Sequence, residues 1–260
     1  MTTVTGMRPD QLGQLLMLAS SNLPIGSYTY SQGVESAIES GVISDEASTL
    51  VFMQDYLALA VVGYELPTLG LIMQALDQGY DVLAAHLAHN YHASLESKEF
   101  VLESQQLAQA MVSWLNEVLA LGIPAEIPDD GYLPLFAHIA QHWQIPLAQS
   151  MTTYGFAQLE NMVLAAVKTV PLGQMAGQRI LWQLQSDLSA QVDALSDNVQ
   201  HGFDTLITSL NTDAVDKSEE QDCQQLCQDL YERLNISNNL PNLAILSSMH
   251  EEQYSRLFRS

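Results

Sequence analysis

The segment KEFVLESQQLAQAMVSWLNEVLAL, residues 98–121, has the apolar spacing of a long helix. Large apolar side chains recur every three or four positions, at Leu102, Leu107, Met111, Trp114, Leu115 and Val118. That spacing places them along one side of an α-helix, with polar residues on the other side. We therefore predict one long amphipathic helix over residues 98–121.

Similar spacing continues on both sides of this segment, and Gly, Pro, Ser and Asp residues divide it into helices. Leu12, Leu15, Leu16 and Ala19 predict a short first helix. Pro67 is expected to begin a new helix, because the missing N–H of proline costs nothing at a helix start. No strand-like alternation of useful length and no internal repeat is present. The prediction is an all-α fold, a single multi-helix bundle-like domain with a partly flexible C-terminal tail. One further helix is predicted to begin at Ser44 or Asp45, with Leu50, Val51, Leu57 and Val61 on its inward side. The other predicted helices lie from Ser31 to Gly41, around 86–91, and over 133–143, 146–170 and 174–195.

The composition limits the possible functions. The 260 residues include 8 Lys and Arg against 30 Asp and Glu, so the formal net charge is −22. Apolar residues make up 47% of the chain and charged residues only 15%, which supports a real core. Nucleic acid and anionic membrane surfaces are excluded as partners, because both need clustered basic side chains.

Three regions are expected along the chain. Residues 1–210 form a helical domain, residues 211–240 an acidic connector with a possible helix around Cys223 to Leu234, and residues 241–260 a partner-binding C-terminal tail. The start of the chain lacks the basic and apolar pattern of a secretory signal, and the longest apolar stretch, Tyr56 to Tyr64, is half of the roughly 20 residues that a spanning helix needs. Two cysteines alone favour a reducing compartment. A cytoplasmic location is the expectation.

Motifs of catalysis are missing from the sequence. The Lys168-Thr169 pair lacks the glycines with which a P-loop cradles phosphates. Ser31 lies in a partial Gly-x-Ser-x-Gly pattern, but Thr29 replaces the first glycine and no strand precedes it. The sequence thus predicts a protein that is not an enzyme and has no catalytic residues.

The His and Cys pairs of the sequence have two interpretations, as metal ligands or as ordinary polar side chains. His138 with His142, and Cys223 with Cys227, are i, i+4 pairs, so each pair lies on one side of a helix. Imidazole and thiolate groups bind nickel and zinc, so either pair is a candidate for a metal-carrying protein. The favoured interpretation is that they are ordinary half-buried polar side chains. His86, His89 and His92 cannot all face one ion from one helix, because His92 is rotated about 120° from His86.

Three segments, taken together, resemble the UreF family of urease accessory proteins over roughly residues 10–260. The first is Leu16 to Glu35, which contains Leu23-Pro24-Ile25-Gly26 and Ser31-Gln32-Gly33-Val34-Glu35. The second is Val170-Pro171-Leu172-Gly173-Gln174 with Gly177-Gln178, and the third is the C-terminus from Ser248 to Ser260. The chain departs from the family pattern in the middle helix, where residues 99–108 lack an arginine and carry Ala108 in place of a glycine. Val34 replaces leucine, and the connector at 211–229 is an extension.

The resemblance implies a non-enzymatic assembly factor. Members of the family are all-α and form homodimers. They bind the scaffold UreD, also called UreH, and then the GTPase UreG, and that complex delivers nickel to apo-urease. The resemblance implies no cofactor for this chain, since nickel is handled by the assembly complex. The alternative function is a nickel-binding carrier that uses the His or Cys pairs.

The predicted partner-binding residues fall in the three matching segments. Apolar, aromatic and Arg side chains in a terminal segment are typical of interfaces, because they bury area and keep directed polar contacts. Each segment has an alternative interpretation. The tail can pack on the chain's own core, and the two tyrosines of the first segment can pack inside the chain. The second segment can be a purely structural corner, and this is the leading interpretation for that segment. The predicted residues are Pro24, Gly26, Tyr28, Tyr30, Ser31, Gly33, Glu35, Pro171, Gly173, Gln174, Tyr254, Arg256, Leu257, Phe258 and Arg259.

Overall fold

A computed structural model describes residues 7–123, 127–170, 172–209, 220–238 and 245–246. Within these ranges the secondary structure is helical and contains no strand, so the predicted all-α class is confirmed. The helices are α1 (Pro9–Leu18), η1 (Ser27–Thr29), α2 (Val34–Glu39), α3 (Glu46–Tyr56), η2 (Leu57–Glu65), α4 (Leu66–Asp77), α5 (Asp81–Ala93), α6 (Lys98–Leu119), η3 (Ile127–Asp130), α7 (Tyr132–His142), α8 (Leu147–Thr169), α9 (Gln174–Ser209) and α10 (Glu220–Leu234).

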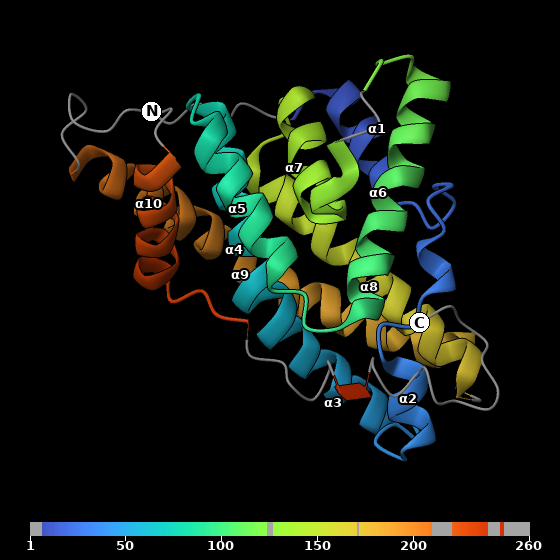
Figure 1. Ribbon diagram of the computed structural model, residues 1–260. Coiled ribbons are helices and arrows are strands. Elements are labelled where there is room, and N and C mark those ends of the chain that lie inside the picture. Colours follow the sequence, from blue (N-terminus) through green and yellow to red (C-terminus); the bar gives the residue numbers. More distant parts are fainter. Residues whose placement is uncertain (1–6, 124–126, 171, 210–219, 239–244, 247–260) are drawn as a thin grey trace.

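Helix α4 is the centre of the fold. It packs against α5, α7, α8 and α9, which surround it in Figure 1. Its side chains are buried on every side of the helix, as expected for a helix that is apolar all round. Residues 46–77 together are long and apolar enough to cross a membrane, but 72% of their most apolar window lies inside the protein. This run is therefore a core helix. Fully buried members are Leu66, Leu69, Leu71 and Ile72.

Pro67 lies in the first turn of α4, as predicted, but α4 follows the preceding helix without a break. Residues 46–77 form one continuous helical run, and Pro67 is the second residue of α4. The preceding segment, η2, is a π-helix over Leu57–Glu65. A π-helix has wider turns than an α-helix, and it is rare and found mostly as single turns within α-helices. We attribute the continuous helix to the wide turn of η2. This turn changes which backbone carbonyl each N–H reaches just before Pro67, which has no N–H to donate.

Helix α6 follows its predicted limits closely. The Ser97 hydroxyl caps its start by accepting from the backbone N–H of Phe100 at 3.2 Å, and Ala120 ends it with a left-handed φ of 54°. The buried stripe contains Leu107, Met111, Trp114 and Leu115, as predicted. Leu102 and Val118 were expected on the same stripe but are 44% and 60% exposed, because the partners of α6 cover only one part of its circumference.

The C-terminal helices differ most from the predicted pattern. Helix α9 continues to Ser209, well beyond the predicted end at residue 195, and its buried residues repeat at helical spacing as far as Phe203. Helix α10 occupies Glu220–Leu234, which confirms the possible helix around Cys223 to Leu234 and starts it three residues earlier. It packs against α5 and α9 (Figure 1), and Cys223, Leu226, Cys227 and Leu230 lie on its buried side.

Several apolar residues expected inside lie at the surface. Leu12 and Leu16 of α1 are 46% and 64% exposed, and Val51 of α3 is 58% exposed. Their helices are covered on one side only, and the residues that reach the core include Leu15 and Leu18 of α1 and Met53 of α3.

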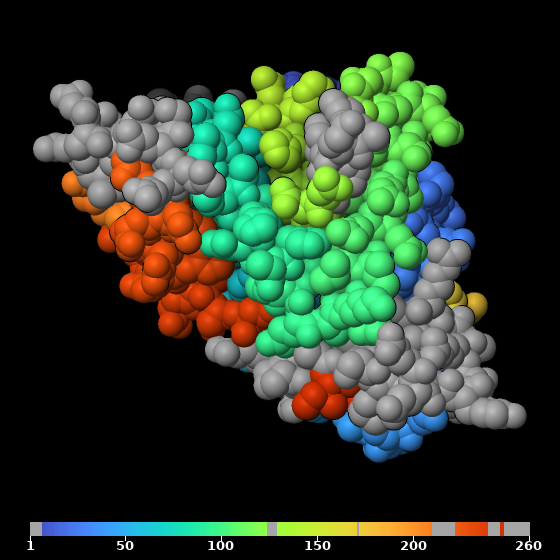
Figure 2. Space-filling model, in the orientation of Figure 1, coloured from blue at the N-terminus to red at the C-terminus, as the bar shows by residue number. Residues whose placement is uncertain are grey.

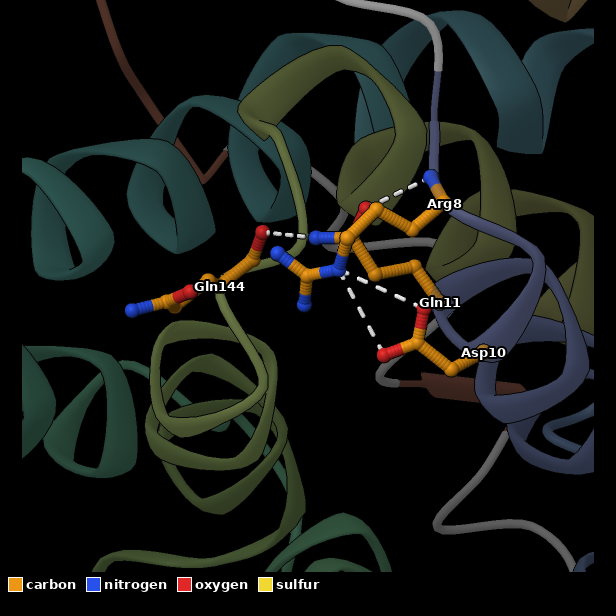
Figure 3. A network of polar contacts seen from close by, with 4 residues as sticks. All are labelled: Arg8, Asp10, Gln11 and Gln144. Carbon is orange, nitrogen blue, oxygen red and sulfur yellow. Dashed lines mark hydrogen bonds and ion pairs between the residues drawn. The ribbon is translucent and has the colours of Figure 1, made fainter.

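Helix α1 is fixed by polar contacts at its start (Figure 3). The Gln11 side chain donates from Nε2 to the carbonyl of Gln144 at 2.5 Å and accepts from the backbone N–H of Arg8 at 2.9 Å. Arg8 also forms an exposed ion pair with Asp10 at 3.3 Å. The Gln144 carbonyl belongs to the turn between α7 and α8, so these contacts hold α1 against that turn. The loop that follows α1 thus begins from a fixed point.

Candidate functional site

The loop after α1 is anchored by buried side chains, and its tip is exposed. Leu23 and Ile25 are buried, whereas Pro24 between them is exposed. Gly26 has a left-handed φ of +79°, a backbone conformation that favours glycine, and its carbonyl accepts from the backbone N–H of Thr29 at 2.9 Å. The loop is therefore a fixed surface feature formed by the residues that were predicted to form it.

Tyr28 joins this loop to the end of α8. Its ring is 49% exposed, and the Lys168 ammonium group lies 5.6 Å from the ring centre. A cation at that distance from an aromatic ring is attracted by the ring's negative face, a contact worth about 0.5–1 kcal/mol at an exposed site. Because Lys168 directly precedes the α8–α9 corner, the first two matching segments lie next to each other at the surface.

The α8–α9 corner has a clear structural role. Val170 is buried, the backbone N–H of Leu172 donates to the Val170 carbonyl at 2.7 Å, and Gly173 has a left-handed φ of +72°. Gly173 and Gln174 are exposed, and Pro171 lies outside the described residues. A Cβ on Gly177 would lie 2.4 Å from Cγ2 of Val167, so a side chain at this position would require α8 and α9 or Val167 to shift.

The remaining predicted residues of the first segment lie inside the protein. Tyr30, Ser31, Gly33 and Glu35 are all buried. The Tyr30 hydroxyl donates to Oε1 of Gln106 on α6 at 2.6 Å. Gly33 is the N-cap of α2, with a left-handed φ of +82°, so this helix begins three residues after the predicted start at Ser31. These four residues shape the loop from within, and their contact with a partner stays a prediction.

Gln32, between these residues, connects the loop to three helices. It has a left-handed φ of 50°, which is uncommon for a residue other than glycine. Its Nε2 donates to Oε1 of Glu103 on α6 at 3.1 Å and to Oε1 of Gln158 on α8 at 3.2 Å. Its Oε1 accepts from the hydroxyl of Tyr56 on α3 at 3.3 Å. The sequence prediction missed this network, because its members are far apart in the chain and share no local motif.

The Glu103-Ser104 pair of the middle helix is also explained by packing. Ser104 accepts from the backbone N–H of Tyr132 at 2.9 Å, and a Cβ on Gly131 would lie 2.2 Å from the Ser104 hydroxyl oxygen. Ser104 thus fixes the start of α7 against α6, while Glu103 accepts from Gln32 in the network described above.

A cavity of about 90 Å³ lies beside this network, lined by tyrosines and carboxylates from several helices. The Glu65 side chain reaches it from the end of the π-helix, and within the described residues its Oε2 atom is buried without a hydrogen-bond partner. Burial raises the pKa of the Glu65 carboxyl to about 7, against a hydrogen bond from Tyr154 that favours the ionised form. Sequence patterns gave no signal for this cavity. Its aromatic lining includes Tyr56, Tyr64, Tyr91, Tyr132 and Tyr154.

The cysteine pair lies in an unfavourable environment for a metal. Cys223 and Cys227 are 1% and 0% exposed, and the Asn90 amide donates to the Cys227 sulfur at 3.0 Å. Burial raises the pKa of the Cys227 thiol to about 11, so the thiolate that would bind a metal is disfavoured at neutral pH.

The histidine pair is more accessible. His138 and His142 lie on α7 and line a cavity of about 350 Å³ between α7 and the chain after α6. Partial desolvation lowers the pKa of His138, which favours the neutral imidazole that can bind a metal. Among the residues that the structure describes, however, no group of three or more His, Cys, Asp and Glu side chains is placed to hold a metal ion.

The fold and the site define the class. The molecule is an all-helical protein whose matching segments build a fixed loop, a helix corner and a buried polar network. The model of the UreF family matches residues 43–185, and the chain belongs to the UreF family of urease accessory proteins. Members are accessory proteins without catalytic activity or a cofactor of their own. The family predicted from the three segments is confirmed.

Curated relatives extend the similarity beyond the family match. The chain is 35% identical over 254 residues to the urease accessory protein UreF of Azoarcus sp. (strain BH72), covering 95% of this chain and 94% of the relative. It is 33% identical over 256 residues to UreF of Nitrosococcus oceani, covering 96% and 100%. It is 34% identical over 260 residues to the bifunctional urease accessory protein UreEF of Bordetella bronchiseptica, covering 96% of this chain and 52% of the fused relative.

Proposed function

We propose that this chain is a cytoplasmic adaptor in urease maturation. In this proposal it binds the UreD/UreH scaffold and the GTPase UreG, and the complex delivers nickel to apo-urease. The observation that carries the proposal is the similarity to urease accessory proteins over nearly their whole length. The fused UreEF relative adds support, because fusion joins a UreF-like chain to a second accessory protein.

The exposed loop supplies one surface for such contacts. Pro24, Gly26 and Tyr28 are at least partly exposed and held in place by buried neighbours, so a partner would meet a pre-ordered surface. Pre-ordering lowers the entropic cost of binding. The Tyr28–Lys168 contact places this loop beside the corner at Gly173 and Gln174, so the proposed surface includes both segments.

The C-terminal tail is the second proposed contact, with the UreD/UreH scaffold. Tyr254, Arg256, Leu257, Phe258 and Arg259 lie outside the described residues, so this part rests on residue type alone. Residues 1–210, 211–240 and 241–260 remain our proposed division into domain, connector and tail, with the connector's second half forming α10.

A homodimer fits the outward side of α9. Met175 and Trp182 are 71% and 74% exposed, one above the other at a spacing of two helical turns. Residues 174–186 contain no acidic residue although the chain carries a net charge of −22, and the single cation, Arg179, pairs with Glu46 at 2.6 Å. Two copies of so acidic a chain repel each other, so a face without acidic residues favours their association. A two-fold axis near the middle of this stretch would bring each copy's Trp182 against the other copy's Met175.

The second candidate function is a nickel carrier. It is supported by the position of His138 and His142 at one cavity, and it lacks support at the buried cysteines. Equilibrium dialysis of the isolated chain against Ni²⁺ separates the two functions. Stoichiometric binding that the His138→Ala/His142→Ala variant loses would favour the carrier.

The test of the adaptor proposal is partner capture by the tagged chain with and without residues 251–260. We expect the intact chain to retain UreD/UreH and UreG, and the shortened chain to lose UreD/UreH while keeping its helical circular dichroism. Equal retention by both chains would refute the tail's role.

A further inference from the structure

The cavity beside the Gln32 network is acidic. Glu65 lines it from the end of η2, and Glu103 lines it from α6. No Lys, Arg or His side chain is found among its described lining residues. Two carboxyl groups therefore meet at one space without a positive charge from those residues, an arrangement that repels an anionic ligand and attracts a cation.

The Glu65 carboxyl has one oxygen without a donor. Tyr154 donates a hydrogen bond to this carboxyl, and the Tyr154 hydroxyl accepts from Nε2 of Gln158 at 2.9 Å. Over the part of the chain that the structure describes, the Oε2 atom of Glu65 is buried and has no hydrogen-bond partner. A buried oxygen without a donor is costly, so a ligand that donates to Oε2 would stabilise the folded protein.

The tyrosine hydroxyls around the cavity donate their protons to other groups. The Tyr56 hydroxyl donates to Oε1 of Gln32 at 3.3 Å, and the Tyr64 hydroxyl donates to Oγ of Ser94 at 2.5 Å. The Tyr154 hydroxyl donates to the Glu65 carboxyl. A phenol has a single proton to donate, and its oxygen can still accept. A ligand in the cavity thus meets these hydroxyls as acceptors, and the ligand that matches them is a donor.

The tyrosine rings add a second attraction for a cation. Tyr64 and Tyr91 stack with their ring centres 6.1 Å apart, and Tyr132 and Tyr154 also stack at 6.1 Å. All four rings line the cavity. The face of an aromatic ring is negative and attracts an ammonium group, more strongly where water is excluded. The cavity volume of about 90 Å³ restricts the ligand to a small one.

The cavity lies just beneath one face of the molecule. Leu95 and Glu96, in the chain between α5 and α6, line it, and Glu96 is exposed. This segment forms the teal-green surface between α5 and α6 in Figure 2. The Glu96 carboxylate adds a negative charge on the solvent side of the cavity, where it attracts cations from solution.

We propose that the cavity is a binding site for a small cation of the ammonium class, which donates one N–H to Oε2 of Glu65 and others to the tyrosine oxygens. Potassium has the same charge but no hydrogen to donate. A divalent metal ion fits less well, because within the described ranges no three His, Cys, Asp or Glu side chains are grouped to hold one. The inference goes beyond the adaptor function and does not depend on it.

The experiment follows thermal unfolding of the full chain in ammonium, potassium and tetramethylammonium chloride. It is done at pH 8, above the pKa of about 7 that burial gives Glu65. Equal salt concentrations, up to about 100 mM, screen the chain's charge to the same extent. Tetramethylammonium supplies the charge without an N–H donor. We expect the highest unfolding temperature in ammonium, by about 3–5 °C once its concentration is about ten times the dissociation constant.

Two variants localise the effect. Glu65→Gln keeps the shape of the side chain and removes its charge, and Ala60→Val fills space, because Ala60 is buried and lines the cavity. Both variants should lose the difference between ammonium and the other salts while they keep their helical circular dichroism. Glu39→Gln, which removes an exposed carboxylate from α2, is the matched control and should keep that difference.

Three results would overturn the site. Equal unfolding temperatures of the wild type in all three salts would mean that the cavity holds water alone. An equal rise in potassium would show that charge without N–H donation is sufficient. A specific effect of ammonium that survives in either Glu65→Gln or Ala60→Val would place the ion elsewhere on this acidic protein. UreD/UreH and UreG take no part in the experiment, so the adaptor proposal is tested separately.

Discussion

Replacing Glu65 with glutamine should change how stability depends on pH. In the folded chain burial raises the carboxyl pKa to about 7, from an ordinary value of 4.5. The native state therefore keeps a proton that the unfolded state releases, and the wild type loses stability as pH rises from 4.5 through 7. At 1.36 kcal/mol per pKa unit, the loss amounts to about 3 kcal/mol once the pH exceeds the folded-state value.

Glutamine has a similar shape and does not ionise, so Glu65→Gln escapes this loss. The unfolding free energy of the variant minus that of the wild type should grow by about 2.5 kcal/mol between pH 5 and pH 8, because a small part of the loss already occurs below pH 5. Urea unfolding followed by tryptophan fluorescence at several pH values measures the difference. Of the 30 acidic residues, both chains share all but Glu65, so taking the difference cancels the general repulsion among the others.

The matched control is Glu39→Gln, which removes an exposed carboxylate from the end of α2. Its stability relative to the wild type should stay constant to within about 0.5 kcal/mol over the same range. A Glu65→Gln difference that is flat with pH, or that falls as pH rises, would show that the cavity does not impose the described environment on this carboxyl.

Three further predictions concern packing, assembly and metal binding. Gly177→Ala should destabilise the fold by about 1–3 kcal/mol in urea unfolding, since the new Cβ meets Val167 at the α8–α9 contact; unchanged stability would mean that the two helices can separate freely. Trp182→Asp should shift the chain from dimer to monomer in sedimentation experiments without loss of helix signal, and a persistent dimer would exclude this face of α9. Replacing both Cys223 and Cys227 with serine should leave Ni²⁺ uptake in dialysis unchanged, because both thiols are buried; lost uptake would identify them as ligands.

The fold class could be predicted from the sequence because helical spacing is a local signal. Leu107, Met111 and Leu115 mark the buried side of α6 without any knowledge of the partner helices. Element ends were predicted less well where tertiary packing decides them. The π-helix before Pro67 continues the helix through a proline, and the second half of α9 is stabilised by α4 and α10, which no local pattern reveals.

The candidate site was predictable in part. The three matching segments identified the family, and two of them meet at the surface through Tyr28 and Lys168. Local patterns do not indicate which motif residues face inward, so buried Tyr30 and Glu35 were grouped with the predicted partner-binding residues, and packing of Tyr30 inside the chain was an open alternative. The Gln32 network was missed because hydrogen bonds between distant elements depend on the fold.

The central claim is that this chain assists nickel insertion into urease through protein contacts. The most direct measurement is the nickel content and activity of urease purified from cells that lack the chain, with and without a plasmid that restores it. We predict nickel-poor, inactive urease without the chain, and recovery with the intact protein and with the His138→Ala/His142→Ala variant alike. Urease that acquires its nickel normally in the absence of the chain would contradict the account.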